Sequence, residues 1–216
     1  PWAPGYAIMV PMDIPLVTGT EPSPWSPRVA VWMDPWPGAV AVYREDGSGG
    51  WDLVRSVGSR SYLGRLTQDL YAGPTGVWDN GNSVYVEMYT GTLANRTEDQ
   101  VLNGANAMAV QNQDGSWEIL QFVTATLTSP KNYTCSKLLR GQLGTEHAMR
   151  NPIPAGSNVV LLTDEMATDP NAASYLPISI GDRGSDLTLR WGNAAKSVDD
   201  DTVYTQGDFV FESVAL

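Results

Sequence analysis

The chain has 216 residues, of which 42% are hydrophobic and 17% are charged, a composition typical of folded proteins and far from that of disordered segments. Its 24 acidic and 13 basic side chains give a formal charge of −11, which argues against a surface that binds nucleic acid or anionic lipid. The single cysteine, Cys135, excludes an internal disulfide framework and a zinc site built from several thiolates.

The two ends of the chain suggest a piece of a longer polypeptide. The chain begins with Pro1 rather than methionine, and it stops at Leu216 directly after a strand-like run. The first ten residues lack the basic segment and the cleavage pattern of a signal peptide. No run approaches the roughly eighteen apolar residues of a membrane-spanning helix. We therefore expect a fragment that is cytosolic or carried by a virion.

Short apolar segments with an alternation of period two recur between scattered glycines and prolines, which is the pattern of half-buried strands. In the fourth such segment Val84, Val86 and Met88 share one face, and the residues between them share the other. The predicted strands, in chain order, are 28–33, 39–44, 51–57, 83–89, 116–127, 132–139, 158–162, 186–191 and 208–214.

Turn residues between these segments predict antiparallel connections. The pairs Asp46-Gly47, Asn80-Gly81 and Asp114-Gly115 tolerate the positive φ of tight hairpins. The last pair is flanked on both sides by alternating segments, so it predicts a hairpin between 107–110 and 117–120.

Helix is expected to be scarce. Thr97 and Gln100 have the spacing of a capping box, but Asn103-Gly104 interrupts the pattern within two turns, so a single short turn is predicted. The run 62–71 is ambiguous, because its leucines fit helical spacing while Gly64 counts against a long helix.

Together these elements predict a mainly β fold of two or three small antiparallel β-barrel or sandwich-like domains with very little helix. Turn-rich stretches place the expected boundaries so that a β domain covers 1–78, a second covers 79–166, and a truncated β segment covers 167–216.

Candidate catalytic residues are few. His147 is the only histidine, which excludes any mechanism that needs two imidazoles. The acid pair Asp164-Glu165 and the run Asp199 to Asp201 are the remaining candidates, and we interpret the run as a solvated loop, with a weak cation site formed by its oxygens as the alternative. Cys135 alternates with its strand neighbours and is expected to be a small buried side chain rather than a nucleophile. We therefore expect no enzyme activity, no cofactor and no metal.

The eight tryptophans raise a glycan-binding module as an alternative, since exposed indoles stack on sugars. Trp32, Trp51, Trp117 and Trp191 lie in strand-like runs, where packing in the core is the favoured role. Trp2, Trp25 and Trp36 adjoin prolines, which suits a rigid loop platform or packing beneath a loop. Core or loop anchoring is the preferred interpretation.

The most distinctive stretch is LLRGQLGTE, Leu138 to Glu146. Gly141 and Gly144 allow a backbone bend that a Cβ would hinder, and Arg140 can fork onto carbonyls or a carboxylate to hold that bend. A phosphate-binding loop would need a Lys-Ser/Thr and a following helix, which are absent. Arg140, Gly141, Gly144 and Thr145 are therefore predicted to form a structural turn.

Taken with its surroundings, this stretch resembles a family: the long tail-tip proteins of gene transfer agents and related long-tailed phages, in the region that follows their TIM-barrel-like domain. The similarity covers most of the chain. The matching pieces occur in the family's order and are MDIPL (12–16), PWPGAVAVYR (35–44), WDNGN (78–82), VLNGANAMAV (101–110), GSWEILQF (115–122), LLRGQLGTE (138–146), AGSNVVLL (155–162) and RWGNA (190–194).

The resemblance implies a component of the baseplate hub at the distal end of a virion tail. Such a protein would form a ring about the tail axis, expected to be a trimer, together with distal tail and other hub proteins. It would serve tail assembly, host attachment and DNA delivery, with neighbouring parts contacting the host envelope. The family's hydrolase-related domain has no counterpart here, so no catalytic residue is carried over. The alternatives are the glycan-binding module and a fragment of a cell-wall hydrolase.

Overall fold

The computed structural model describes residues 5–17, 19, 23–162 and 169–214, and the chain divides into two compact units. One unit comprises Tyr62–Ala172 with the short segment Val17–Gly19. The other comprises Pro1–Leu16, Thr20–Ser61 and Ala173–Leu216. The acid pair Asp164-Glu165, Trp2 and the expected boundary at 166/167 lie outside the described residues.

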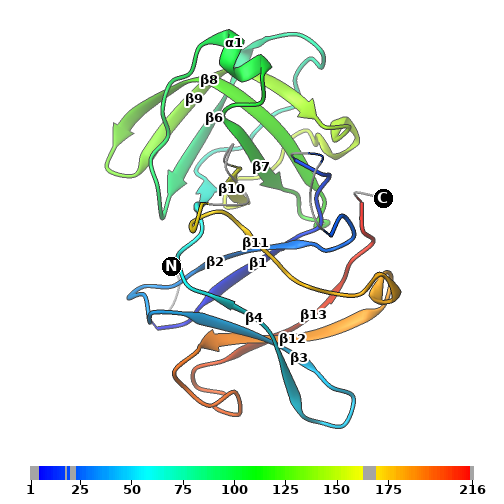
Figure 1. The fold of residues 1–216 in the computed structure, drawn as a ribbon. Helices are drawn as coiled ribbons and strands as arrows, with labels where there is room; N and C mark the ends of the chain where they lie inside the picture. Colours follow the sequence, from blue (N-terminus) through cyan, green and yellow to red (C-terminus); the bar gives the residue numbers. More distant parts are fainter. Residues whose placement is uncertain (1–4, 18, 20–22, 163–168, 215–216) are drawn as a thin grey trace. The chain divides into compact units, whose positions relative to one another are not determined.

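The unit formed by Tyr62–Ala172 is a closed antiparallel barrel (Figure 1). Alternating side chains from its strands fill the interior, with Phe122, Leu138, Met108, Val86 and Val159 all fully buried in one cluster. Its six strands follow one another around the barrel in the order β10 (Asn158–Leu162), β5 (Leu63–Leu66), β6 (Asp79–Met88), β9 (Asn132–Gln142), β8 (Trp117–Ser129) and β7 (Ala107–Gln111).

Two short helical turns lie in the barrel's connections. Helix α1 (Glu98–Leu102) begins with the predicted capping box, in which Thr97 and Gln100 satisfy each other's backbone amides. It ends at Asn103, and Gly104 follows with a φ of 104°. The prediction of a single short turn is confirmed. The second turn, η1 (Glu146–Ala148), follows directly on the LLRGQLGTE stretch.

The other unit contains two antiparallel sheets that share one core. The smaller sheet has the order β1 (Ile8–Met12), β2 (Arg28–Trp32), β11 (Ser174–Tyr175). The larger has the order β13 (Thr205–Val210), β12 (Asp186–Asn193), β3 (Val40–Glu45), β4 (Trp51–Val57), and the 3-10 turn η2 (Ile180–Asp182) precedes β12 (Figure 1). Val31 of the smaller sheet and Val42 and Leu189 of the larger belong to one buried cluster, as expected of a sandwich.

The expectation of a mainly β fold with barrel- and sandwich-like parts and very little helix is confirmed. The Asp114-Gly115 hairpin is also confirmed, since β7 and β8 pair antiparallel from Ala107↔Gln121 to Gln111↔Trp117. Of the ambiguous run 62–71, residues Leu63–Leu66 form strand β5, in which Leu63 and Leu66 are buried and which pairs with the neighbouring strands β10 and β6. Strand β1 was not predicted, and Pro11 within it obscures the signal of a strand.

The expected segments 1–78, 79–166 and 167–216 do not coincide with the two units. Strand β12 of the last segment pairs with β3 of the first over Leu189↔Arg44 to Asn193↔Val40. Strand β5 of the first segment pairs with β6 of the second. The boundaries were placed at clusters of turn residues, which indicate loops. Turn residues do not indicate which strands pair across the sequence, so these pairings could not be predicted from them.

Candidate functional site

The end of the barrel where β6 and β8 begin and β9 ends holds a buried cluster of charged side chains. Arg140 is fully buried, and its Nε and Nη2 donate to Glu118 Oε1 and Oε2 at 2.7 and 2.9 Å. Its Nη1 donates to the Tyr71 carbonyl at 2.8 Å and lies 3.6 Å from Asp79 Oδ2. Arg140, Glu118 and Asp79 are called the Arg140 cluster below. It joins three strands and the segment that precedes β6.

Asp79 holds its own backbone turn as well as facing Arg140. Its Oδ1 accepts hydrogen bonds from the amides of Gly81 and Asn82, both at 3.0 Å, and its Oδ2 accepts one from Asn82 Nδ2 at 2.8 Å. Burial alone would raise the pKa of Asp79, but these hydrogen bonds and the charge of Arg140 outweigh burial and lower the pKa. The carboxylate is therefore held in its charged form.

This turn corrects one prediction. Asn80-Gly81 is not the turn of a hairpin, because both residues lie within β6, where the pairing with β9 shifts register between Asp79 and Ser83. The Asp79 side chain bonds to the backbone two and three residues ahead, which gives the irregular start of β6 a local partner. Asp-Asn-Gly thus forms a bulge inside a strand, and the dipeptide alone does not distinguish the two outcomes.

The predicted turn residues lie directly beside the cluster. Gly141 has a φ of 59° and its amide donates to Glu118 Oε1 at 3.3 Å. A Cβ at Gly141 would lie 2.7 Å from Glu146 Cγ, so a larger residue meets a steric clash as well as an unfavourable φ. Gly144 has a φ of 79° but open space around the position of a Cβ.

Thr145 completes the turn. Its hydroxyl accepts from the Ile119 amide at 2.9 Å and donates to the Gln142 carbonyl at 2.7 Å. The structure therefore brings Arg140, Gly141 and Thr145 together around the start of β8, and Arg140 forks onto a carboxylate.

Sequence reasoning missed the two carboxylates that complete the cluster. A signal was present, because Glu118 is in phase with the core residues Leu120 and Phe122, and Arg140 is in phase with Leu138. A charge at an inward-facing position needs an opposite charge nearby. Opposite charges at inward-facing positions of neighbouring strands therefore predict a buried pair.

The Arg140 cluster is built for stability rather than for reaction. All three side chains are at most 3% exposed, so a substrate has no access to them. The bidentate Arg–carboxylate geometry satisfies both charges, and removal of one partner would leave an uncompensated buried charge. The arrangement can fix the register and the closure of the barrel.

Comparison with known families points to the same part of the chain. Residues 61–160 match the family model described as Rcc01698-like, C-terminal. The match begins just before β5 and ends within β10, so it covers five strands of the barrel completely and the start of the sixth. Three quoted pieces of the tail-tip resemblance, WDNGN, GSWEILQF and LLRGQLGTE, each contribute one residue of the Arg140 cluster. No curated protein matches the chain.

The other candidates from the sequence have ordinary surroundings. Cys135 is buried, and burial raises the pKa of its thiol to about 12. His147 Nδ1 lies 3.1 Å from the Gly144 carbonyl. Asp201 pairs with Arg190, and Asp200 accepts from Thr202, in the loop between β12 and β13. Within the described ranges, no three His, Cys, Asp or Glu side chains are grouped so that they could hold a metal ion.

The tryptophans that the structure describes do not form exposed platforms. Trp117 and Trp191 are buried, and Trp191 Nε1 donates to the Ala7 carbonyl at 3.0 Å. Trp25 Nε1 donates to the Ile178 carbonyl at 3.1 Å, and the Trp78 ring lies 5.3 Å from Lys137 Nζ. None of the tryptophans in the described part of the chain is fully exposed. Stacking of a sugar on an exposed indole therefore has no support from their placement.

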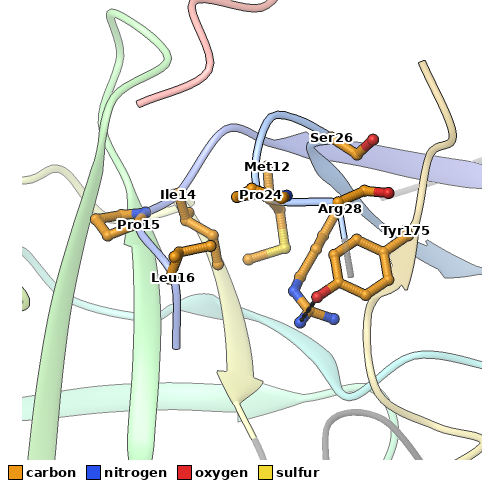
Figure 2. Close-up of a pocket in the computed structure, with 9 residues that line it drawn as sticks. Met12, Ile14, Pro15, Leu16, Pro24, Ser26, Arg28 and Tyr175 are labelled. Atoms are coloured by element: carbon orange, nitrogen blue, oxygen red, sulfur yellow. Dashed lines mark hydrogen bonds between the residues drawn. The ribbon is translucent and has the colours of Figure 1, made fainter. Parts of the chain in front are cut away.

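In the sandwich unit, one pocket lies between β2 and the segments that flank it. Figure 2 shows Met12, Ile14 and Leu16 on one side and Arg28 beside Tyr175 on the other. Arg28 Nη2 donates to the Tyr175 hydroxyl at 2.9 Å, and its guanidinium lies 4.1 Å from the ring centre. The pocket has a volume of about 10 Å³, which holds one water molecule at most. It is too small for an organic ligand.

The MDIPL piece has a structural role in the same unit. The Asp13 carboxylate accepts hydrogen bonds from the amides of Glu212, Ser213 and Val214 at 2.7, 2.9 and 3.0 Å. It therefore ties the segment after β13 to the segment after β1. Among the described residues, no helix has the length and apolarity needed to cross a membrane.

Proposed function

We propose that this chain is a structural component of the tail tip, or baseplate hub, of a phage or gene transfer agent. The observation that carries the proposal is the convergence of WDNGN, GSWEILQF and LLRGQLGTE on one buried ion cluster. Short sequence similarities that are scattered along a chain carry little weight alone. Three that meet in one structural centre support one another.

The family match supports this proposal. The Rcc01698-like, C-terminal model covers the barrel, and it is compatible with the resemblance to tail-tip proteins of gene transfer agents. The barrel's only buried charges of opposite sign serve its own packing, among the residues that the structure describes. That arrangement suits a structural part better than a catalyst.

In this function the chain has no catalytic role and needs no cofactor. Its parent protein assembles as a closed ring about the tail axis, most simply a trimer, with distal tail and other hub proteins as neighbours. Cyclic symmetry allows identical contacts to close around a tube. The formal charge of −11 would let DNA pass without adhering, because like charges repel. The site of action is the virion tail tip, where neighbouring parts contact the host envelope.

Immunogold labelling tests this assignment. Antibodies raised against the chain would be applied to intact and to detergent-opened particles, with antibodies to the major capsid protein as the control. Gold at the distal end of the tail is the expected result. Gold over the capsid or along side fibres would refute the proposal, and so would the absence of the protein from purified particles.

A further inference from the structure

The β8–β9 hairpin is longer than closure of the barrel requires. Strands β8 and β9 have 13 and 11 residues, but β7 pairs with only the first part of β8. The segment before α1 covers the next part of this edge, because the Arg96 amide donates to the Val123 carbonyl at 2.9 Å and Asn95 Oδ1 accepts from the Ala125 amide at 2.8 Å. Residues 126–131 lie beyond this cover and are all exposed, and they are called the hairpin tip.

The hairpin tip combines a free strand edge, an apolar side chain and a positive charge. Leu127 is in phase with Val123 and Ala125, so its backbone N–H and C=O point to the same edge of β8, where no strand pairs among the described residues. The Leu127 side chain is 59% exposed. Lys131 is exposed and has no ion pair in the part of the chain that the structure describes. The sequence from 119 to 145 contains no acidic residue, which sets the tip apart in a chain with a formal charge of −11.

Strand β13 gives the sandwich unit a free edge of opposite charge. It is the last strand of its sheet and pairs with β12 alone, as far as the chain is described. Val210 is 47% exposed, and it shares the outer face of the sheet with Asp186 opposite it and with Asp208 two residues before it. Glu212 follows and is exposed, while Arg183 Nε donates to the Glu212 carbonyl at 2.6 Å. Three carboxylates and one guanidinium leave a negative surface, which is called the β13 edge.

We propose that the hairpin tip of one copy of this chain pairs with the β13 edge of a second copy. An exposed, unpaired strand edge is a template for pairing with another chain. Backbone hydrogen bonds between the two edges give the contact its affinity, Leu127 covers Val210, and Lys131 lies against the carboxylates of the β13 edge. A second copy fits better than an unrelated partner, because this chain carries both halves of the contact and the two halves have opposite charge.

The contact is heterologous, because the two surfaces that meet are different. Heterologous contacts close into a ring when the rotation between copies permits it. In the ring of the proposed function, on which this placement rests, each copy gives its hairpin tip to one neighbour and receives the tip of another at its β13 edge. An edge contact of a few residues buries less than the roughly 1,200–2,000 Å² of a stable interface, so the isolated chain is expected to associate weakly.

Intermolecular paramagnetic relaxation, measured by NMR, detects weak contacts of this kind. Copies that carry a nitroxide at Ser129→Cys in the hairpin tip are mixed with ¹⁵N-labelled copies that carry none. Cys135 is buried and burial raises the pKa of its thiol to about 12, so the nitroxide attaches at position 129. We expect the signals of 206–212 in the ¹⁵N-labelled copies to broaden. A nitroxide at Gln113→Cys, in the exposed β7–β8 turn of the same barrel, is the matched control and should leave those signals sharp.

Charge reversal makes the test specific to this pair of surfaces. Lys131→Glu in the nitroxide-carrying copies should reduce the broadening at least fivefold, and so should Glu212→Lys in the ¹⁵N-labelled copies. Combining the two variants should restore the broadening, because opposite charges again face each other. Leu127→Ser should weaken the broadening without any change of charge.

Three outcomes would overturn the inference. One is broadening at 206–212 no greater than that of the Gln113→Cys control. Another is broadening that both charge reversals leave unchanged. The third is broadening that occurs only when both labels are on one chain diluted with unlabelled chain, which would mean that the tip contacts its own sandwich unit. The immunogold result for the tail tip is independent of all three, so failure of the contact and failure of the proposed function are distinguishable. Melting temperatures of the variants would show that each one remains folded.

Discussion

Replacing Arg140 with methionine tests whether the buried ion cluster holds the barrel together. The change keeps most of the side-chain volume but leaves Glu118 and Asp79 as buried carboxylates without their cation, and the Tyr71 carbonyl without its donor. Breaking a buried pair in this way costs about 3–5 kcal/mol. With an m-value of about 2 kcal/mol per M, the urea midpoint should fall by roughly 1.5–2.5 M.

The matched control is Arg65→Met in the same barrel. Arg65 also pairs with a glutamate of a neighbouring strand, Glu87, but its side chain is 44% exposed. Exposed pairs contribute about 0–1 kcal/mol, so its midpoint should change little. Urea unfolding followed by tryptophan fluorescence measures both variants. An equal, small loss in the two variants would refute the argument for the Arg140 cluster.

A double variant separates charge from shape. Glu118→Leu combined with Arg140→Met removes both members of the bidentate pair and replaces them with apolar side chains. Substituting a buried pair as a whole is often neutral, so the double variant should recover the part of the loss that comes from the unpaired Glu118 carboxylate, while Asp79 and the Tyr71 carbonyl still lack Arg140. A double variant as unstable as the single one would show that packing, rather than the unpaired charge, explains the loss.

Three further experiments test the barrel, two of them beside the cluster. Gly141→Ala should lower the free energy of unfolding by about 1–3 kcal/mol and more than Gly144→Ala does, because only at Gly141 does a Cβ also clash; equal losses would contradict this ranking. The pKa of Asp79 is lowered in the folded state, so its contribution is complete above its ordinary pKa of 3.8 and is lost as the pH falls below it. Asp79→Asn should therefore destabilise the chain at pH 7 and flatten the loss of stability on acidification, and an unchanged pH profile would contradict this. Cys135, with its thiol pKa near 12, should react with a thiol reagent at pH 8 only after denaturant is added; rapid reaction of the native chain would show an open barrel.

The local elements of this fold could be predicted from sequence because their causes are local. The capping box of Thr97 and Gln100 and the Asp114-Gly115 hairpin each depend on residues that are close in the chain. The buried face of β6 also follows from the alternation of Val84, Val86 and Met88. Where the cause is distant, prediction failed, as in the pairing of β12 with β3 that places both ends of the chain in one unit.

In the candidate site, too, the local features could be predicted from the sequence and the contacts between distant residues could not. The positive φ of Gly141 and the forked role of Arg140 could be anticipated from a glycine-rich turn that carries an arginine. The partner of that arginine, Glu118, lies 22 positions away, and only closure of the barrel brings it to Arg140. The pair Asn80-Gly81 was predicted to be a hairpin turn, but it lies in a bulge of β6. The Asp79 side chain accepts hydrogen bonds from the Gly81 and Asn82 amides, and the dipeptide alone does not reveal this local partner.

Cryo-electron microscopy of the intact particle tests the central claim most directly. The barrel strands and the β8–β9 hairpin are sufficiently characteristic to be fitted to a density map of the tail tip. We predict that the barrel fits density in a ring about the tail axis at the distal end of the tail, in as many copies as the local rotational symmetry demands. Density for this chain in the capsid shell, or in fibres away from the axis, would contradict the assignment to the hub.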